Sequence, residues 1–200
     1  MDRTILAADS KKDTDEQLVE RVFKGEKQAF DLLVLRHQHR LLGLIGRIVR
    51  DPHEAEDVAQ EAFIKAYRAL HNFRGDSAFY TWLYRIAINT ANNYLVSKGR
   101  RPPDIDIDVD DPEQQDVQAV MADIESPESA HTRDELKAAI DRAISELPED
   151  LRTAFTLREF NGLSYEEITE IMGCPVGTVR SRIFRAREAI DAKIRPLLDS

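Results

Sequence analysis

Cysteine and long apolar stretches are scarce in this chain of 200 residues. A single cysteine, Cys174, excludes a disulfide within the chain, and its place in a predicted turn is better explained by packing than by reactivity. The longest uninterrupted apolar run, Leu41 to Gly46, is far shorter than a membrane span, and no signal-peptide pattern opens the chain. We therefore expect a soluble, cytoplasmic protein that does not insert directly into a membrane.

The residue patterns of catalytic and metal sites are also missing. The five histidines are scattered, and His37 and His39 would face different sides of a helix. There is no glycine loop that could cradle phosphate and no spacing typical of metal ligands. The sequence predicts that the protein is not an enzyme and needs neither a cofactor nor a metal.

Charge is unevenly distributed along the chain. The net charge of -9 would argue against nucleic-acid binding if it were evenly spread. Residues 101–131 hold ten acids against the single base Arg101, so the rest of the chain balances at 27 bases and 27 acids. Basic patches elsewhere can therefore still attract phosphate, while the whole molecule is repelled from nonspecific DNA.

The acidic stretch divides the chain into two domains. Because it contains four prolines, few bulky apolar residues and no helical period, it is predicted to be an extended or flexible linker. We expect an all-α protein with an N-terminal tail (1–14), one small helical domain (15–97), the linker (98–131) and a second small helical domain (132–200).

Helix signals support this division. In the first domain, helices are predicted at about 15–24 and 27–49, and a third begins at Asp51-Pro52, an N-cap followed by a proline at the first helical position. In the second domain, Thr132 and Glu135 suggest a capping box that begins a helix ending at Pro148, and another helix is predicted at about 149–159.

The third helix is predicted to be strongly amphipathic. One face is an apolar stripe from Ala55 to Leu70, and the other is acidic. The acidic face comprises Glu54, Glu56, Asp57, Gln60, Glu61 and Lys65. By itself such a face is usually only solvated.

The segment from Phe73 to Arg101 holds six of the chain's aromatic residues beside Arg85, Asn89, Asn92 and Asn93. Some of these rings must be core, but one helix does not bury all six. A surface that binds single-stranded DNA needs exposed rings that stack on bases, amides that bond to base edges and cations that hold the backbone. The segment therefore predicts a surface for unpaired bases.

Residues 164–190 predict a helix-turn-helix. Ser164 and Glu167 form a capping box, Gly173 to Pro175 make the turn, and Val179, Ile183, Ala186 and Ile190 fall on one buried face of the second helix. The opposite face is basic, as a helix in the major groove requires, because guanidinium groups contact guanine edges or phosphates. It comprises Thr178, Arg180, Ser181, Arg182, Phe184, Arg185 and Arg187.

Three segments together resemble regions 2 and 4 of the extracytoplasmic-function (ECF) sigma factors of bacterial RNA polymerase, closest to the sigma-E type. They are DPHEAEDVAQEAFIKAYRAL, FRGDSAFYTWLYRIAINTANNYL and the stretch from LPEDLRTAF to RAREAI, and they occur in the family's order and spacing. The resemblance implies a promoter-specificity subunit that has no catalytic activity of its own and acts at stress-response promoters. It also implies an anti-sigma partner, often membrane-anchored, that is wedged between the domains.

The same resemblance assigns roles to individual residues. It implies that the acidic helix docks on the clamp helices of the polymerase through Glu54, Glu56, Asp57, Gln60 and Glu61. It also implies that the protein contacts the flap of the polymerase. It implies that Phe73, Arg74, Ser77, Arg85 and Asn89 hold the unstacked strand of the -10 element. It implies that Thr178, Arg180, Ser181, Arg182, Phe184 and Arg185 read the -35 duplex, and that the linker enters the polymerase's channel.

One alternative stays open at this stage. A free-standing helix-turn-helix regulator that binds DNA as a dimer explains residues 164–190, but it leaves the segment rich in aromatic and asparagine residues without a role. A gel shift without polymerase would separate the two.

Overall fold

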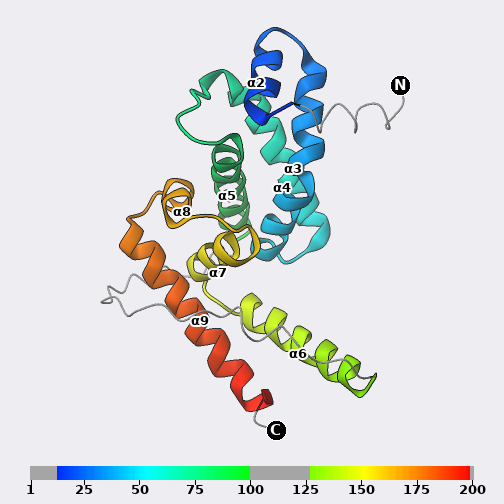
Figure 1. The fold of residues 1–200 in the computed structure, drawn as a ribbon, viewed down its shortest axis with the longest axis vertical. Coiled ribbons are helices and arrows are strands. Elements are labelled where there is room, and N and C mark those ends of the chain that lie inside the picture. Colours follow the sequence, from blue (N-terminus) through cyan, green and yellow to red (C-terminus); the bar gives the residue numbers. More distant parts are fainter. Residues whose placement is uncertain (1–12, 100–126, 199–200) are drawn as a thin grey trace.

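The computed structural model describes residues 13–99 and 127–198, and these residues form helices without any strand. The predicted tail up to Lys12 and the acids from Asp104 to Glu125 lie outside the described residues. The helices are α2 (Asp15–Phe23), α3 (Lys27–Ile48), α4 (Pro52–Ala69), α5 (Phe79–Ser97), α6 (Pro127–Ser145), α7 (Glu149–Phe155), α8 (Tyr165–Met172) and α9 (Val176–Leu198) (Figure 1). A 3-10 turn, η1 (Leu70–Asn72), follows α4, and a π-helical turn, η3 (Thr156–Phe160), follows α7. The predicted all-helical fold class is confirmed.

Local capping explains where several helices begin. The carboxylate of Asp51 accepts hydrogen bonds from the backbone N–H groups of His53 and Glu54, and Pro52 occupies the first turn of α4, as predicted. At α2, Thr14 and Gln17 form a capping box that the sequence analysis did not identify.

The N-terminal helices pack around one core. α3 lies against α2 and α4, and α5 lies against both α3 and α4. Leu33, Leu44, Ala62 and Leu83 are among the fully buried side chains at their contacts. The predicted apolar stripe of α4 is buried apart from Tyr67, whose ring is 42% exposed and packs edge-on against Phe30 of α3.

The C-terminal helices differ from expectation in two places. The predicted capping box at Thr132 is wrong, because α6 already begins at Pro127 and Thr132 lies within it. Proline is a favoured first residue of a helix, which explains the earlier start. The helix predicted to reach Glu159 is α-helical only to Phe155 and then widens into η3, while Gly162 follows with φ of +69°.

The two halves of the chain are in contact with each other. α8 packs on α5, and α7 packs on α3 (Figure 1). A single apolar cluster runs from the N-terminal core into the C-terminal half, where it includes Leu157, Ile168 and Ile183. A second cluster joins α6, α7 and α9 through Ile144, Phe155 and other side chains. Contact between the halves was not predicted.

A partly buried charge cluster holds α2 on α3. Asp15, at the start of α2, accepts a hydrogen bond from Arg36 at 2.6 Å and lies 2.8 Å from Nε2 of His37. Burial alone would raise the pKa of Asp15, but the hydrogen bonds and charges of His37 and Arg36 outweigh it and lower that pKa below its usual value.

Asp15→Asn is therefore expected to reduce the free energy of unfolding by about 1.5–3 kcal/mol at neutral pH, because it removes the charged acceptor. Since the folded pKa lies below the unfolded one, this stabilisation is present above the unfolded pKa and is lost as the pH falls through the folded pKa. Urea unfolding of parent and variant across acidic pH checks this. If the difference in free energy of unfolding between parent and variant did not shrink in acid, the role of the carboxylate charge would be contradicted.

Candidate functional site

The helix-turn-helix is formed by α8, the turn at Gly173–Pro175 and α9. Glu167 accepts hydrogen bonds from the backbone N–H and hydroxyl of Ser164, at 2.8 and 2.9 Å, and the hydroxyl oxygen of Ser164 accepts from the N–H of Glu167 at 3.2 Å. Gly173 is left-handed, with φ of +65°. Val179, Ile183, Ala186 and Ile190 are all buried. The predicted capping box, turn and inner face are confirmed.

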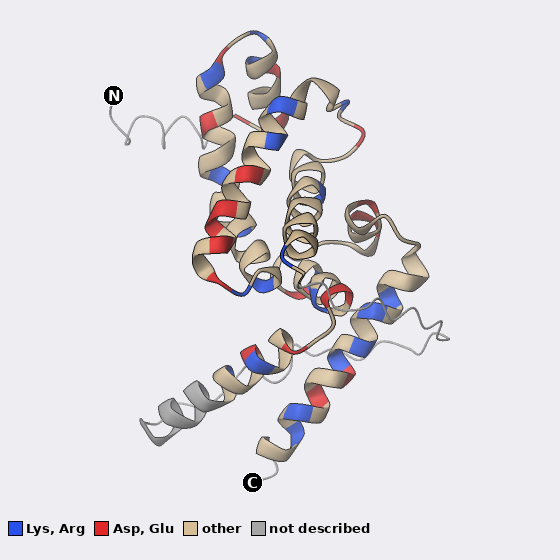
Figure 2. Cartoon of the chain, turned by 180° about the vertical axis from the view of Figure 1, so that it is seen from behind, with Lys and Arg blue, Asp and Glu red and all other residues tan. Residues whose placement is uncertain are grey.

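The helix α9 is rich in basic residues, and Figure 2 shows the positions of lysines and arginines along it. Arg180 is exposed, with its guanidinium 5.5 Å from the ring centroid of Tyr165. Four further residues of the predicted -35 surface are partly exposed: Thr178, Ser181, Phe184 and Arg185. These side chains share the face that the sequence predicted.

Two arginines of α9 are held by acids of the neighbouring elements. Arg182 donates to Asp150 at 2.5 Å and to Sγ of Cys174 at 3.3 Å, and its side chain is 18% exposed. Arg187 donates to Glu159 at 2.7 Å. In the free protein these two guanidinium groups brace α9, whereas base reading by Arg182 would require it to leave Asp150.

Cys174 lies in the turn and is partly buried. Burial raises the pKa of its thiol, although the nearby Arg182 opposes the shift. The thiol is therefore protonated at neutral pH, which agrees with the packing role expected from the sequence.

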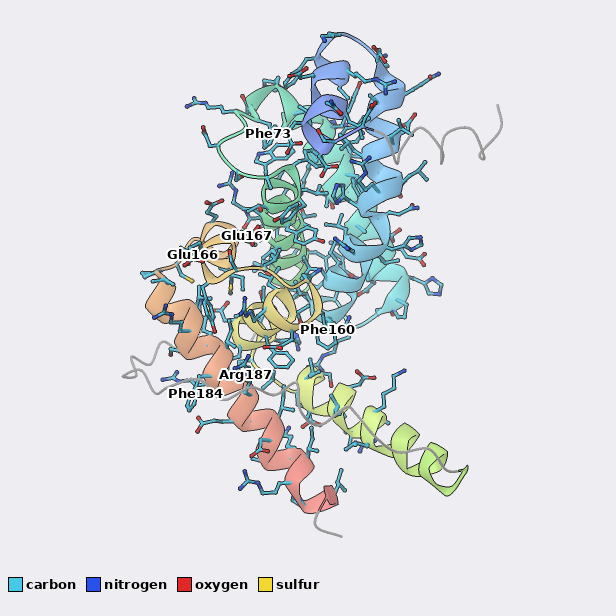
Figure 3. The ribbon with its side chains drawn as sticks, viewed as in Figure 1. Phe73, Phe160, Glu166, Glu167, Phe184 and Arg187 are labelled. Carbon is cyan, nitrogen blue, oxygen red and sulfur yellow. The ribbon has the colours of Figure 1, made fainter. Side chains whose placement is uncertain are left out.

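The predicted -10 surface lies on α5 and on the loop before it. Arg85, Asn89 and Asn93 are exposed on α5. In the preceding loop Arg74 is exposed and Ser77 is partly exposed. Phe73, at the start of this loop, is labelled in Figure 3. Cationic and amide side chains are therefore exposed on α5 and in the loop before it, and their contact with the -10 strand stays a prediction.

The expectation that some of the six aromatic rings are core and that not all six are buried is confirmed, whereas contact of these rings with unpaired bases stays a prediction. Phe79, Trp82 and Tyr84 are buried, and Phe73, Tyr80 and Tyr94 are half-buried. The ring of Phe73 packs against Trp82 and Phe79, with centroids 5.3 and 5.9 Å apart. The buried rings are covered by more than one neighbour, because α3, α4 and α8 all pack against α5.

Two tyrosines of α5 contact the C-terminal half. The hydroxyl of Tyr80 donates to the carboxylate of Glu167 on α8, and the side-chain amide of Asn161 donates to the hydroxyl of Tyr84 at 3.4 Å. The hydrogen bond to Glu167 is the main reason that the pKa of Tyr80 is raised. Burial would raise the pKa of Glu167, but hydrogen bonds from Tyr80 and Ser164 lower it. Glu167 thus stays ionised and Tyr80 stays protonated at neutral pH.

The predicted acidic face of α4 is on the surface. Glu56, Asp57, Gln60 and Glu61 are exposed, whereas Glu54 pairs with Lys98 at 3.1 Å. Glu61 also pairs with Lys65 of the same helix, at 2.8 Å. Figure 2 shows this concentration of acidic residues along α4.

An open groove of about 730 Å³ lies beside this acidic face, between α3 and α4. Its floor is apolar, with Phe30, Val34 and Phe63, and Ile64 and Tyr67 at its edge are 44% and 42% exposed. Glu56 and Gln60 of the predicted docking face line its rim. The sequence analysis missed the groove. The sequence signal for the groove was the pair of apolar residues Ile64 and Tyr67 among polar neighbours on α4.

The part of the chain that the structure describes contains neither a candidate membrane span nor a candidate metal site. Within residues 13–99 and 127–198, no helix is both long and apolar enough to cross a membrane. The same residues contain no group of three His, Cys, Asp or Glu side chains arranged to hold a metal ion.

Both domains match known families. Residues 33–101 match Sigma-70 region 2, and residues 137–190 match Sigma-70, region 4. The RNA polymerase sigma-H factor of Pseudomonas aeruginosa is 68% identical over 184 residues, which span 92% of this chain and 95% of that protein. The ECF RNA polymerase sigma-E factor of Escherichia coli K12 is 60% identical over 185 residues, 92% of this chain and 96% of that protein.

Solved structures show the same fold. CnrH in complex with the cytosolic domain of CnrY superposes with a TM-score of 0.65 at 26% identity, covering 94% of this chain and 98% of that one. The sigma factor RpoE of Bartonella quintana, in complex with the anti-sigma factor NepR, gives a TM-score of 0.61 at 23% identity over 83% of this chain and 96% of that one. With two family matches and two full-length relatives in agreement, the chain belongs to the ECF sigma factors of bacterial RNA polymerase.

Proposed function

We propose that this sigma factor directs core polymerase to stress-response promoters by reading two promoter elements with separate domains. The outer face of α9 reads the -35 duplex, and the polar face of α5 with its preceding loop holds the unstacked -10 strand. The observation that carries this proposal is that one chain displays a basic helix-turn-helix face and, on a different domain, exposed cationic and amide side chains. A regulator that binds only duplex DNA requires the helix-turn-helix face but not the exposed side chains on the other domain.

The polymerase would dock on the groove between α3 and α4 and on the adjacent acidic face. An apolar floor with exposed Ile64 and Tyr67 suits the apolar side of a partner helix, which is a common recognition mode. The exposed acids Glu56, Asp57 and Glu61 would complement basic residues beside that helix. The family resemblance names the clamp helices of the largest subunit as this partner, with the flap as a second contact.

Regulation by an anti-sigma factor follows from the relatives. The sigma factor RpoE of Bartonella quintana was solved with the anti-sigma factor NepR, and CnrH was solved with the cytosolic domain of CnrY. We propose the same control here, by an anti-sigma factor anchored in the membrane. Co-purification of such a protein with the tagged chain from detergent extracts tests it, and recovery only from the soluble fraction would contradict the anchor.

Run-off transcription tests the central proposal. Core polymerase with the purified chain should produce specific transcripts from candidate promoters, and polymerase alone should not. A gel shift of the chain without polymerase provides the comparison. Tight sequence-specific binding by the free chain, combined with no stimulation of transcription, would favour the free-standing regulator.

Arg185→Ala is expected to weaken promoter recognition by about 1–3 kcal/mol, because it removes a base contact from the partly exposed face of α9 without opening the core. Transcription from promoters substituted base by base measures this: sensitivity should relax at the -35 element alone. Arg195→Ala is the control, since Arg195 pairs with Asp191 near the far end of the same helix. An unchanged -35 profile in the Arg185 variant would contradict the assignment.

A further inference from the structure

Arg182 lies on the flank of α9, between the buried face and the outer face of the helix. Because each residue turns an α-helix by about 100°, Arg182 points about 40° from Ala186 and about 60° from Val179, and both of these side chains are fully buried. On the other side of Arg182, Arg185 points about 60° away and Phe184 about 160° away. Arg182 is therefore nearer to the core of its domain than the outermost side chains of α9 are.

The guanidinium of Arg182 joins α9 to two neighbouring elements. Its Nη2 donates at 2.5 Å to the carboxylate of Asp150, in the first turn of α7, and its Nη1 lies 3.3 Å from Sγ of Cys174, in the turn before α9. The side chain of Arg182 is 18% exposed and that of Asp150 is 42% exposed. Since α7 also packs closely on α9, this one side chain fixes α9 both to α7 and to the turn.

These contacts use the part of the guanidinium that would read a base. An arginine recognises a guanine edge with two N–H groups of its planar fork. In Arg182 both terminal nitrogens already contact protein atoms. To reach the duplex, Arg182 would have to give up its hydrogen bond to the carboxylate of Asp150, and such a charge-assisted bond is stronger than a neutral one.

We propose that Arg182 does not contact the -35 element, and that Asp150 is a positioning residue that acts through Arg182 to set the orientation of α9 on the duplex. The inference rests on the proposed function, because it concerns how the -35 element is read. Reading then falls to the outermost side chains of α9, and a residue of another helix decides how they are presented. A turned helix loses several contacts at once, because base edges are read only within hydrogen-bond distance.

Neutralising Asp150 distinguishes this role from base reading by Arg182, because the two predict opposite results. If Arg182 read the duplex, Asp150→Asn would release it and would also remove an acid that repels phosphate, so promoter recognition would strengthen. If Arg182 positions α9, the same variant loosens the helix, and recognition of the -35 element weakens.

The experiment uses the full-length protein assembled with core polymerase. Transcription is measured from a promoter that is active in the run-off assay and from the same promoter with its -35 element substituted, and the ratio of the two rates is the discrimination. Asp150→Asn is expected to lower this ratio about fivefold or more, because a charge-assisted hydrogen bond is lost. A smaller folded fraction reduces both rates alike, so it does not change the ratio.

Asp191→Asn is the matched control, because Asp191 pairs with Arg195 near the far end of α9. It makes the same change of side chain and of net charge, and its discrimination should equal that of the parent. Arg182→Gln should lower discrimination in the same direction as Asp150→Asn. Adding Asp150→Asn to it should have a reduced further effect, because the two residues share one ion pair.

Salt dependence tests separately whether Arg182 holds a phosphate. The affinity of the assembled polymerase for a promoter fragment falls as salt rises, and losing one phosphate contact reduces the slope of log affinity against log salt by about one. Adding Arg182→Gln to Asp150→Asn should leave this slope unchanged, because the inference gives Arg182 no contact with the DNA.

Three results would overturn the inference. They are a discrimination in Asp150→Asn that equals or exceeds that of the parent, an equal loss in Asp191→Asn, and a salt slope that is reduced by about one when Arg182→Gln is added. A parent protein whose transcription does not depend on the -35 element would instead contradict the proposed function. The two failures are therefore distinguishable.

Discussion

Arg85→Ala combined with Asn89→Ala is expected to block promoter opening while leaving polymerase binding intact. Both side chains are exposed on α5, so their removal should not disturb the core. Each lost contact to an unstacked base weakens binding by about 1–3 kcal/mol. Because the open complex is maintained by those contacts, the reactivity of thymines near the start site towards permanganate should fall close to that of the closed duplex.

Gln28→Ala is the control for this experiment, because Gln28 is an exposed amide side chain on α3, outside the predicted -10 surface. Phe73→Ala is a poorer test, since the ring packs on Trp82 and Phe79 and its loss would also loosen the domain. Normal opening by the double variant would show that this face of α5 is an ordinary solvated surface.

Ile64→Glu is expected to weaken assembly with core polymerase by about 2–4 kcal/mol, or about 30- to 700-fold. Ile64 is 44% exposed at the edge of the groove, so the free protein tolerates a carboxylate there. A partner helix seated in the groove would bury that charge without a partner and would lose the apolar contact. Competition with a labelled sigma factor for core polymerase measures the affinity.

Leu35→Glu is the matched control, because Leu35 is 41% exposed on α3 and does not line the groove. It introduces the same charge at nearly the same exposure. Equal losses in the two variants would indicate a general charge effect, and no loss in either would place the polymerase contact elsewhere.

Features set by neighbours in the chain were predictable from the sequence. The Asp51-Pro52 start of α4, the Ser164–Glu167 capping box and the buried face of α9 all depend on spacing within one or two turns. Each side chain there meets a partner three or four residues away, and so the pattern identifies both.

Features set by packing between distant segments were not predictable. Nothing near Tyr80 indicates that its hydroxyl meets Glu167, which lies far along the sequence. Which rings of the aromatic segment are buried depends on α3, α4 and α8, which all pack against α5 and come from other parts of the sequence. The groove escaped prediction for the same reason, because its two walls belong to different helices.

The π-helical turn at Thr156–Phe160 gives the length of this segment a particular importance. A π turn accommodates one residue more than an α turn. Deleting one residue there would restore α periodicity and leave Phe160 facing Arg47, whose guanidinium lies 3.8 Å from its ring centroid, whereas a regular α turn without the deletion would rotate Phe160 by about 100° about the helix axis. Homologues with a one-residue deletion at this point would therefore keep the ring–guanidinium contact if they retain both side chains, so an alignment gap here indicates a regular α turn and not the loss of that contact.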